Sequence, residues 1–153
     1  MKKSVLFALL VSGITVLNAQ TLNSNGLYVD NEGQLFSGII SKHENNTRAE
    51  LQVKDGQLNG IATYYYASGK VMEKGLFVNG QKDQKWERYN EGGQVAAIAF
   101  YHLGKKDGNW MVFDDKGNKR FEMTYADGKK SGVWTSWDEN GKVLETKDYS
   151  SVN

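Results

Sequence analysis

The chain of 153 residues contains no cysteine and no proline. Without cysteine it can form neither a disulfide framework nor a thiolate metal site, and it offers no lipid-acceptor thiol near its N-terminus. Ordinary packing must therefore hold the fold together. An excess of one charge is also missing, because 19 basic residues nearly balance 18 acidic residues. A near-neutral protein has no overall field that attracts nucleic acid, so we expect no nucleic-acid partner.

An apolar run at the N-terminus extends from Val5 to Leu17, preceded by Lys2 and Lys3 and followed by the small residue Ala19. This order is typical of a secretory signal peptide, and the run is short for a membrane span. A buried core helix is the alternative interpretation, but the two lysines and the polar residues after the run favour export. The sequence predicts a signal-peptide helix over 1–19, cleavage near Ala19, and a periplasmic or secreted mature protein.

Glycine and aromatic residues are abundant and recur at a fixed interval. The segment "GNWMVFDDKG" (Gly108–Gly117) returns 24 residues later as "GVWTSWDENG" (Gly132–Gly141). The same interval separates the members of five further sets: Gly69, Gly93, Gly117 and Gly141; Gly80, Gly104 and Gly128; Trp86, Trp110 and Trp134; Tyr65, Tyr89, Phe113 and Trp137; and Phe77, Tyr101, Tyr125 and Tyr149. We predict tandem units with a 24-residue period, about 4.5 copies in all.

Each unit contains two glycine turns and two short runs rich in β-branched and aromatic residues. Glycine allows the positive φ of a tight turn, and Asn140-Gly141 is a strong hairpin signal. The runs have the length and composition of strands. The sequence therefore predicts an all-β fold, an elongated single-layer antiparallel sheet of tandem β-hairpins. Residues 20–37 would form a lead-in with a half-repeat, 38–149 the repeat domain, and 150–153 a C-terminal tail.

The aromatic residues of one run do not share a face in a regular strand. Trp86 and Tyr89 are three positions apart, so either both faces of the sheet carry large rings or a bulge turns one ring. Both interpretations stay open. Because 15 of the 18 aromatic residues lie between Gly60 and Tyr149, we expect the rings first of all to stack between units and stabilise the sheet.

These columns resemble the MORN-variant repeat family, often called YwqK-type antitoxin repeats. The family pattern is close to Gly-x-Trp-x-x-Tyr-x-x-x-Gly, and Gly108, Trp110 and Phe113 follow it here, as does "DGKKSG" at 127–132. The resemblance covers about residues 31–149. It implies an elongated sheet of hairpins that serves as a scaffold for interactions with proteins or membranes.

The chain departs from the family pattern at two positions and in one general feature. Ala62 replaces a tryptophan and Gln84 replaces a glycine, which bears on the edges of those units. An export signal also fits poorly with an antitoxin that acts on a cytoplasmic toxin.

Residues that could carry chemistry are few, and we predict no enzyme, no metal and no cofactor. The sequence has only two histidines, His43 and His102, which we interpret as structural or surface residues, and no nucleophile elbow or phosphate loop. Four aspartates recur beside the second turn of each unit. Paired acids could hydrolyse glycosides, but in exposed turns beside lysines we expect unperturbed pKa values and a role in turn formation. They are Asp55, Asp83, Asp107 and Asp127.

The candidate interaction surface consists of the recurring lysines and rings. Stacked hairpins would place Lys82, Lys105, Lys106, Lys129 and Lys130 in a row along one edge, with about 10 Å between units. We prefer the interpretation of solvated turns that discourage edge aggregation, and the alternative is a strip that binds anionic lipid headgroups or an acidic polymer. If Trp86, Trp110 and Trp134, or Tyr65, Tyr89, Phe113 and Trp137, were exposed, they would form a ladder for a protein or glycan.

The functional hypothesis is an exported, non-enzymatic scaffold that mediates protein–protein interaction in the cell envelope, since repeat arrays provide extended surfaces. One alternative is direct binding of polysaccharide or anionic lipid headgroups through the tryptophan and lysine rows. An antitoxin or immunity-like protein, and a purely structural spacer, are further alternatives. The partner is expected to be another envelope or secreted protein.

Overall fold

The computed structural model describes residues 20–150. The predicted signal peptide and residues 151–153 of the predicted tail lie outside this range. The described residues form thirteen β-strands and no helix. The prediction of an all-β, antiparallel fold is therefore confirmed for this part of the chain.

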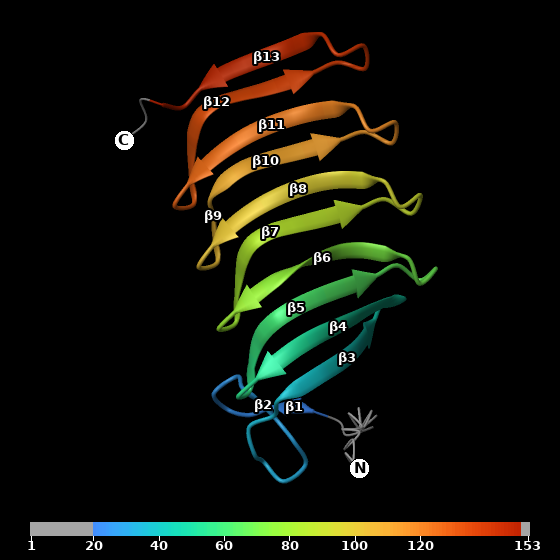
Figure 1. Ribbon diagram of the computed structural model, residues 1–153, viewed down its shortest axis with the longest axis vertical. Helices are drawn as coiled ribbons and strands as arrows, with labels where there is room; N and C mark the ends of the chain where they lie inside the picture. The colour runs from blue at the N-terminus through green and yellow to red at the C-terminus, as the bar shows by residue number, and fades with distance from the viewer. Residues whose placement is uncertain (1–19, 151–153) are drawn as a thin grey trace, which may run out of the picture.

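One antiparallel sheet contains nearly all the strands, in an order that follows the sequence (Figure 1). Apart from β9, each strand pairs with the preceding and following strands of the sheet, and β3 and β13 are the outermost strands. The short β9 (Lys105–Lys106) pairs with β8 only. The other strands are β3 (Gly38–Glu44), β4 (Thr47–Lys54), β5 (Gln57–Tyr65), β6 (Val71–Val78), β7 (Gln81–Tyr89), β8 (Val95–His102), β10 (Gly108–Phe113), β11 (Lys119–Ala126), β12 (Lys129–Trp137) and β13 (Val143–Asp148).

Turns of two kinds join the strands, one kind along each of the two long sides of the sheet that the strand ends form. Along one side lie two-residue turns in which both residues have positive φ, a geometry that matches the right-handed twist of paired strands. These turns are Asp55-Gly56, Asn79-Gly80, Leu103-Gly104 and Asp127-Gly128. The other side carries longer loops, in which Asn90, Asp114 and Asp138 accept backbone N–H groups two or four residues on. All seven predicted turn glycines have positive φ.

Strand pairing is irregular beside the second ring of each hairpin. The register shifts at Tyr65, Tyr89, Phe113 and Trp137, where the opposite strand passes over one residue. These bulges do not bring the second ring to the face of the first. Trp86 lies opposite Ala99, whereas Tyr89 donates its hydroxyl to Glu87, whose side chain is on the other side of β7. Both faces therefore carry rings; we term the side of Trp86 the tryptophan face and the other the opposite face.

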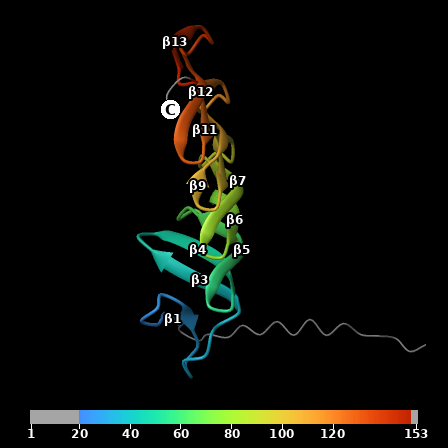
Figure 2. The ribbon, with the colours of Figure 1, turned by 90° about the vertical axis from the view of Figure 1, so that its left-hand side faces the viewer.

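The buried core lies at the N-terminal end of the sheet, on the tryptophan face. It consists of Tyr28, Ile40, Ala49, Leu51, Val53, Ala62 and Trp86. Residues 20–37, which contain β1 (Thr21–Leu22) and β2 (Tyr28–Val29), lie against this end of the sheet in Figure 2. Tyr28 donates its backbone N–H to the carbonyl of Gly56 at 2.8 Å, and Lys42 donates to its hydroxyl at 2.9 Å.

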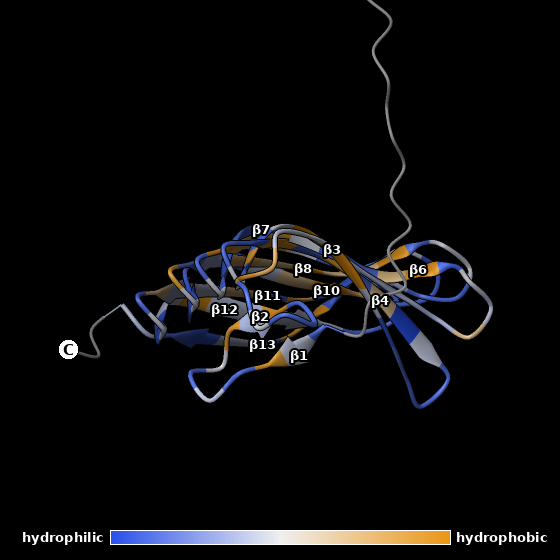
Figure 3. Cartoon of the chain, turned by 90° about the horizontal axis from the view of Figure 1, so that it is seen from below, coloured by the Kyte–Doolittle hydropathy of each residue, from blue (hydrophilic) through white to orange (hydrophobic). Residues whose placement is uncertain are grey.

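The remainder of the sheet is a single thin layer (Figure 2). No residue of β10, β11, β12 or β13 is fully buried. In Figure 3 the strands carry both hydrophobic and hydrophilic residues, and the loops are predominantly hydrophilic. Among residues 20–150 there is no helix with the length and apolar character that a membrane crossing requires.

Candidate functional site

A continuous file of rings runs across the tryptophan face from β6 to residue 149, with tryptophans and tyrosines alternating after the first member. Neighbouring ring centroids are 4.8–6.4 Å apart, and the planes are tilted or edge-to-face, as the quadrupoles of aromatic rings prefer. The file consists of Phe77, Trp86, Tyr101, Trp110, Tyr125, Trp134 and Tyr149.

The indole nitrogen of each tryptophan in the ring file forms a hydrogen bond within the sheet. The indole N–H donates to the backbone carbonyl ten residues earlier in the chain. The three bonds join Trp86 to Leu76 at 3.1 Å, Trp110 to Phe100 at 3.0 Å and Trp134 to Thr124 at 2.9 Å. These donors anchor the rings to the preceding hairpin, and the tryptophans are in the first place part of the scaffold.

One lysine of each hairpin lies over the ring file. The Nζ atoms of Lys82, Lys106 and Lys130 are 3.6, 4.2 and 4.5 Å from the centroid of the nearest tryptophan. Each also lies 4.8–5.4 Å from the following tyrosine. Such contacts are cation–π interactions, and they hold the ammonium groups at fixed places along the file.

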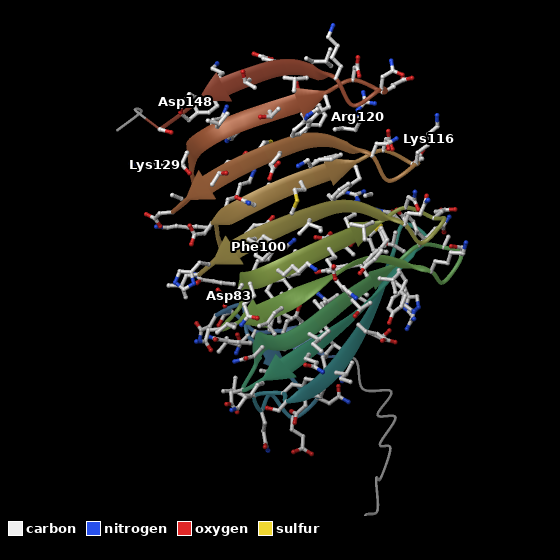
Figure 4. All side chains as sticks on the ribbon, turned by 45° about the horizontal axis from the view of Figure 1, so that its top comes forward. Asp83, Phe100, Lys116, Arg120, Lys129 and Asp148 are labelled. Atoms are coloured by element: carbon white, nitrogen blue, oxygen red, sulfur yellow. The ribbon has the colours of Figure 1, made fainter. Side chains whose placement is uncertain are left out.

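The predicted row of lysines is divided between the two faces. Lys106 and Lys130 are paired with Tyr101 and Tyr125 and share the tryptophan face. Lys105 and Lys129 are the preceding residues and point to the opposite face. Figure 4 places Lys129 near one long edge, and Lys116 and Arg120 near the other.

The recurring aspartates connect successive turns. Asp83 accepts the backbone N–H of Leu103, and Asp107 accepts that of Asp127. The expectation of exposed aspartates with unperturbed pKa values is wrong in two cases. The side chain of Asp83 is only 15% exposed, since it lies within β7 beside His102. A hydrogen bond from Lys105 at 2.6 Å holds the pKa of Asp127 below its usual value.

Trp86 is buried, whereas the later tryptophans of the ring file are not. Trp86 is 2% exposed because its indole lies over Gly75, where an added Cβ would be 2.2 Å from the ring. Gly75 pairs with Ala62, the residue that departs from the tryptophan column, so two small residues make room for one large ring. Trp110 and Trp134 are partly exposed. The tryptophans therefore do not form an open row at the N-terminal end.

The second predicted column, Tyr65, Tyr89, Phe113 and Trp137, lies on the opposite face, where basic side chains lie beside its rings. Arg48 lies 3.9 Å from the centroid of Tyr65 and is paired with Glu50. Hydrogen bonds from Tyr65 and then Arg48 lower the pKa of Glu50. Lys74 and Lys119 lie 5.3 and 4.7 Å from the centroids of Tyr89 and Trp137, respectively. Phe113 lies opposite Lys119 in the ladder.

An apolar surface remains uncovered on the C-terminal part of the tryptophan face. We term it the C-terminal floor and define it by Val112, Phe121, Met123 and Trp134. Register places Phe121 opposite Val112 on one side and Ser136 on the other, and its side chain is 47% exposed. A shallow depression here is lined by eight residues, which include Phe121, Met123 and Trp134 and the charged Glu145 and Lys147.

Three lysines on the C-terminal part of the tryptophan face have no carboxylate partner. Within residues 20–150, Lys106, Lys130 and Lys147 form no ion pair, and their contacts are with aromatic rings. By contrast, Lys82 in the N-terminal part is paired with Glu73 at 3.0 Å. Sequence reasoning missed Phe121, Met123 and Lys147. Strand register alone brings them beside the tryptophans, and no repeat column marks them.

The two histidines are not brought together. His43 lies in β3 and His102 at the end of β8, with β4 to β7 between them. The described part of the chain holds no group of three or more histidine and carboxylate side chains that could bind a metal.

Residues 58–79 and 130–150 match the family model of the MORN repeat variant. The first MORN-variant stretch includes most of β5 and all of β6, and the second runs from β12 through β13. No curated protein matches the chain.

Two solved structures are similar at low identity. The crystal structure of TarM has 13% identity and a TM-score of 0.38 over 71% of this chain and 19% of that chain. The crystal structure of accessory secretory proteins 1, 2 and 3 of Streptococcus pneumoniae has 17% identity and a TM-score of 0.38 over 81% and 22%, respectively. The present chain spans about a fifth of the length of each.

Proposed function

We propose that the protein is an exported, non-enzymatic scaffold that binds another protein of the cell envelope through the C-terminal floor. The observation that carries this proposal is that one end of the tryptophan face is covered by another segment of the chain, whereas the other end is not. Residues 20–37 lie over the N-terminal end, where the core is buried. Nothing in residues 20–150 covers the C-terminal floor, where Phe121 is 47% exposed.

The composition of this surface suits a protein partner. Interface centres are enriched in aromatic residues and methionine, and their rims are polar. The floor supplies Phe121, Met123 and Trp134, and Lys130 lies over Trp134, 4.5 Å from its ring centroid. A single exposed aromatic side chain is ordinary, but here it adjoins a depression and a row of unpaired cations.

The same proposal includes the finer assignment of the chain. We infer a YwqK-type MORN-variant array with a 24-residue unit, exported by a signal peptide at 1–19 and cleaved near Ala19. The two MORN-variant matches support the repeat. The equivalent indole–carbonyl bonds of Trp86, Trp110 and Trp134 support the period.

Site-specific photo-crosslinking in cells tests the proposal. A photoreactive phenylalanine replaces Phe121 on the floor, or Val133 on the opposite face as the matched control, since the two side chains are 47% and 51% exposed. We expect a discrete, saturable crosslink to one protein from position 121 and none from position 133. Equal labelling from both positions, or no discrete product from a folded protein, would contradict the proposal.

The second candidate function is binding of an acidic polysaccharide or anionic lipid surface. The unpaired Lys106, Lys130 and Lys147 favour it. Against sugar stacking, ammonium groups already occupy positions over the tryptophan rings at 4.2 and 4.5 Å. Co-sedimentation with anionic vesicles and with an acidic polysaccharide, at low and high salt, tests this function, because binding by exposed charges weakens as salt screens them.

A further inference from the structure

The outer edge of β13 is an exposed strand edge. β13 pairs with β12 on one side, and within residues 20–150 no strand lies on its other side (Figure 1). All six of its residues are exposed, including Val143 at 49% and Leu144 at 65%. An open edge presents unpaired backbone N–H and C=O groups, which form a template for another strand.

The pairing with β12 determines which backbone groups face outward. The backbone N–H of Tyr149 donates to the carbonyl of Gly132 at 2.8 Å, so the backbone hydrogen-bonding groups of residue 149 point toward β12. In an antiparallel ladder this direction alternates along the strand. Lys147 and Glu145 therefore share the inward direction, whereas Thr146 and Asp148 direct their backbone groups away from β12.

One antiparallel register fits this edge to a second copy of itself. With Thr146 opposite Thr146 of the second copy, the outward-facing backbone groups meet. Glu145 then lies opposite Lys147 of the second copy, and Lys147 opposite Glu145, on the tryptophan face. A slip of two residues sets Glu145 against Glu145 or Lys147 against Lys147, and like charges directly opposite destabilise a pair.

We propose that two copies of the chain associate through their β13 strands into a symmetric dimer with a continuous sheet. Charge complementarity favours a second copy as the partner of this edge. Charged side chains on an edge commonly discourage pairing with other strands, but here they are complementary to the symmetry-related strand in this register. Opposite residues share a face, so the two C-terminal floors lie on the same side of the joined sheet.

The other outer strand, β3, has a similar pattern about His43, which would set Lys42 opposite Glu44 of a second copy. Lys42, however, already donates to the hydroxyl of Tyr28 at 2.9 Å and lies 5.0 Å from the centroid of its ring, so it is less available for a partner strand than Lys147. Pairing β13 with β3 of another copy, with Thr146 opposite Ser41, gives one contact of opposite charges, Glu145 with Lys42, and would continue without closing. The closed β13 dimer gives two such contacts. Because a single pair of strand edges is a small interface, we expect a weak, concentration-dependent dimer.

Analytical ultracentrifugation of the full chain over a range of concentrations tests the dimer. Glu145→Lys and Lys147→Glu should each weaken self-association at least about tenfold, since each places like charges opposite one another twice. The double variant Glu145→Lys/Lys147→Glu should restore it. A mixture of the two single variants should form a heterodimer, although neither forms a homodimer. Lys129→Glu, away from this edge, is the control and should dimerise as the parent does.

Thr146→Pro provides an independent variant. The N–H of Thr146 points away from β12, so proline removes a bond of the dimer and none of the ladder within the monomer. We expect a monomer with the parent's circular dichroism spectrum. A parent protein that stays monomeric at millimolar concentration, single variants that dimerise as the parent does, a mixture without heterodimer, or open-ended filaments would each overturn the proposal. These outcomes are independent of crosslinking from position 121, which tests the proposed function.

Discussion

The two ends of the sheet use the same side-chain contacts under different conditions of burial. At the N-terminal end, Trp86 is 2% exposed, and its neighbours belong to a core that the lead-in covers. At the C-terminal end, Trp134 makes the same type of indole–carbonyl bond, yet its strand has no fully buried residue. Local sequence thus determines the hydrogen bond, while the neighbouring hairpins determine how much water reaches the ring.

The two ends of the sheet therefore differ in how much buried surface stabilises them. Burying an aromatic side chain contributes strongly to stability, so the N-terminal end should hold most of the folding free energy. The C-terminal end keeps apolar groups and unpaired lysines in contact with solvent. This exposed end is the surface to which we propose that a partner binds.

The largest expected effect comes from the tryptophans themselves. Trp86→Ala should lower the free energy of unfolding by about 3–5 kcal/mol, because it leaves a cavity in the core. Trp134→Ala removes a partly exposed ring and should cost roughly half as much. Urea unfolding followed by circular dichroism measures both. Equal losses would show that the lead-in contributes no extra burial at the N-terminal end.

A smaller effect is expected from filling the space beneath Trp86. A Cβ at Gly75 would lie 2.2 Å from the indole, so Gly75→Ala should destabilise by about 1–3 kcal/mol through overpacking. Gly92→Ala is the control: its φ is not in the positive region, and its Cβ would meet only the side-chain ends of Asn90 and Gln94. A neutral Gly75→Ala in thermal and urea unfolding would contradict the tight contact.

Replacing the lysines over the ring file should lower the free energy of unfolding less than replacing the tryptophans, and again more at the N-terminal end than at the C-terminal end. Lys82 lies 3.6 Å from the centroid of the buried Trp86, so Lys82→Gln should cost about 1 kcal/mol. Lys130 lies 4.5 Å from the centroid of the partly exposed Trp134, and Lys130→Gln should cost about 0.5 kcal/mol. Urea midpoints of the two variants compare them, and a larger loss for Lys130 would reverse this order.

The smallest effect concerns pH and separates the ion-paired part of the sheet from the unpaired part. Hydrogen bonding from Lys85, with help from Tyr89 and Lys74, lowers the pKa of Glu87. A carboxyl with a lowered folded pKa stabilises the protein above its unfolded value, about 4.3, and this contribution is lost as pH falls through the folded value.

Glu87→Gln should therefore flatten the fall in stability on acidification below about pH 5. Glu139, an exposed loop residue that forms no ion pair within residues 20–150, provides the control variant Glu139→Gln. Urea unfolding at a series of pH values measures the slopes. An unchanged slope for Glu87→Gln would show that its contacts do not persist in solution.

Much of the fold could be predicted because turn chemistry and strand composition are local. Glycines such as Gly80 and Gly128 adopt the positive φ that their turns require, and the strands lie between them. Leu103 was not predictable as a turn residue of the same kind. It has a φ of 46° at a place where other turns have Asn or Asp, so the fixed hairpin length imposes the conformation.

The candidate site was only partly predictable. The columns of tryptophan and lysine pointed to the ring file, but adjacent lysines such as Lys105 and Lys106 look equivalent in sequence. Alternation along the strand separates them, and only Lys106 reaches the ring file. Phe121 belongs to no predicted column, because its place on the floor depends on pairing with two neighbouring strands.

The sequence by itself determined the all-β class and the positions of the glycine turns, because each follows from the preferences of residues close together in the chain. Only the tertiary structure decided which rings are buried, which lysines lack a carboxylate partner and which strand edge is open. These properties depend on register and on what covers a face. Both are set by contacts between residues that are distant along the chain.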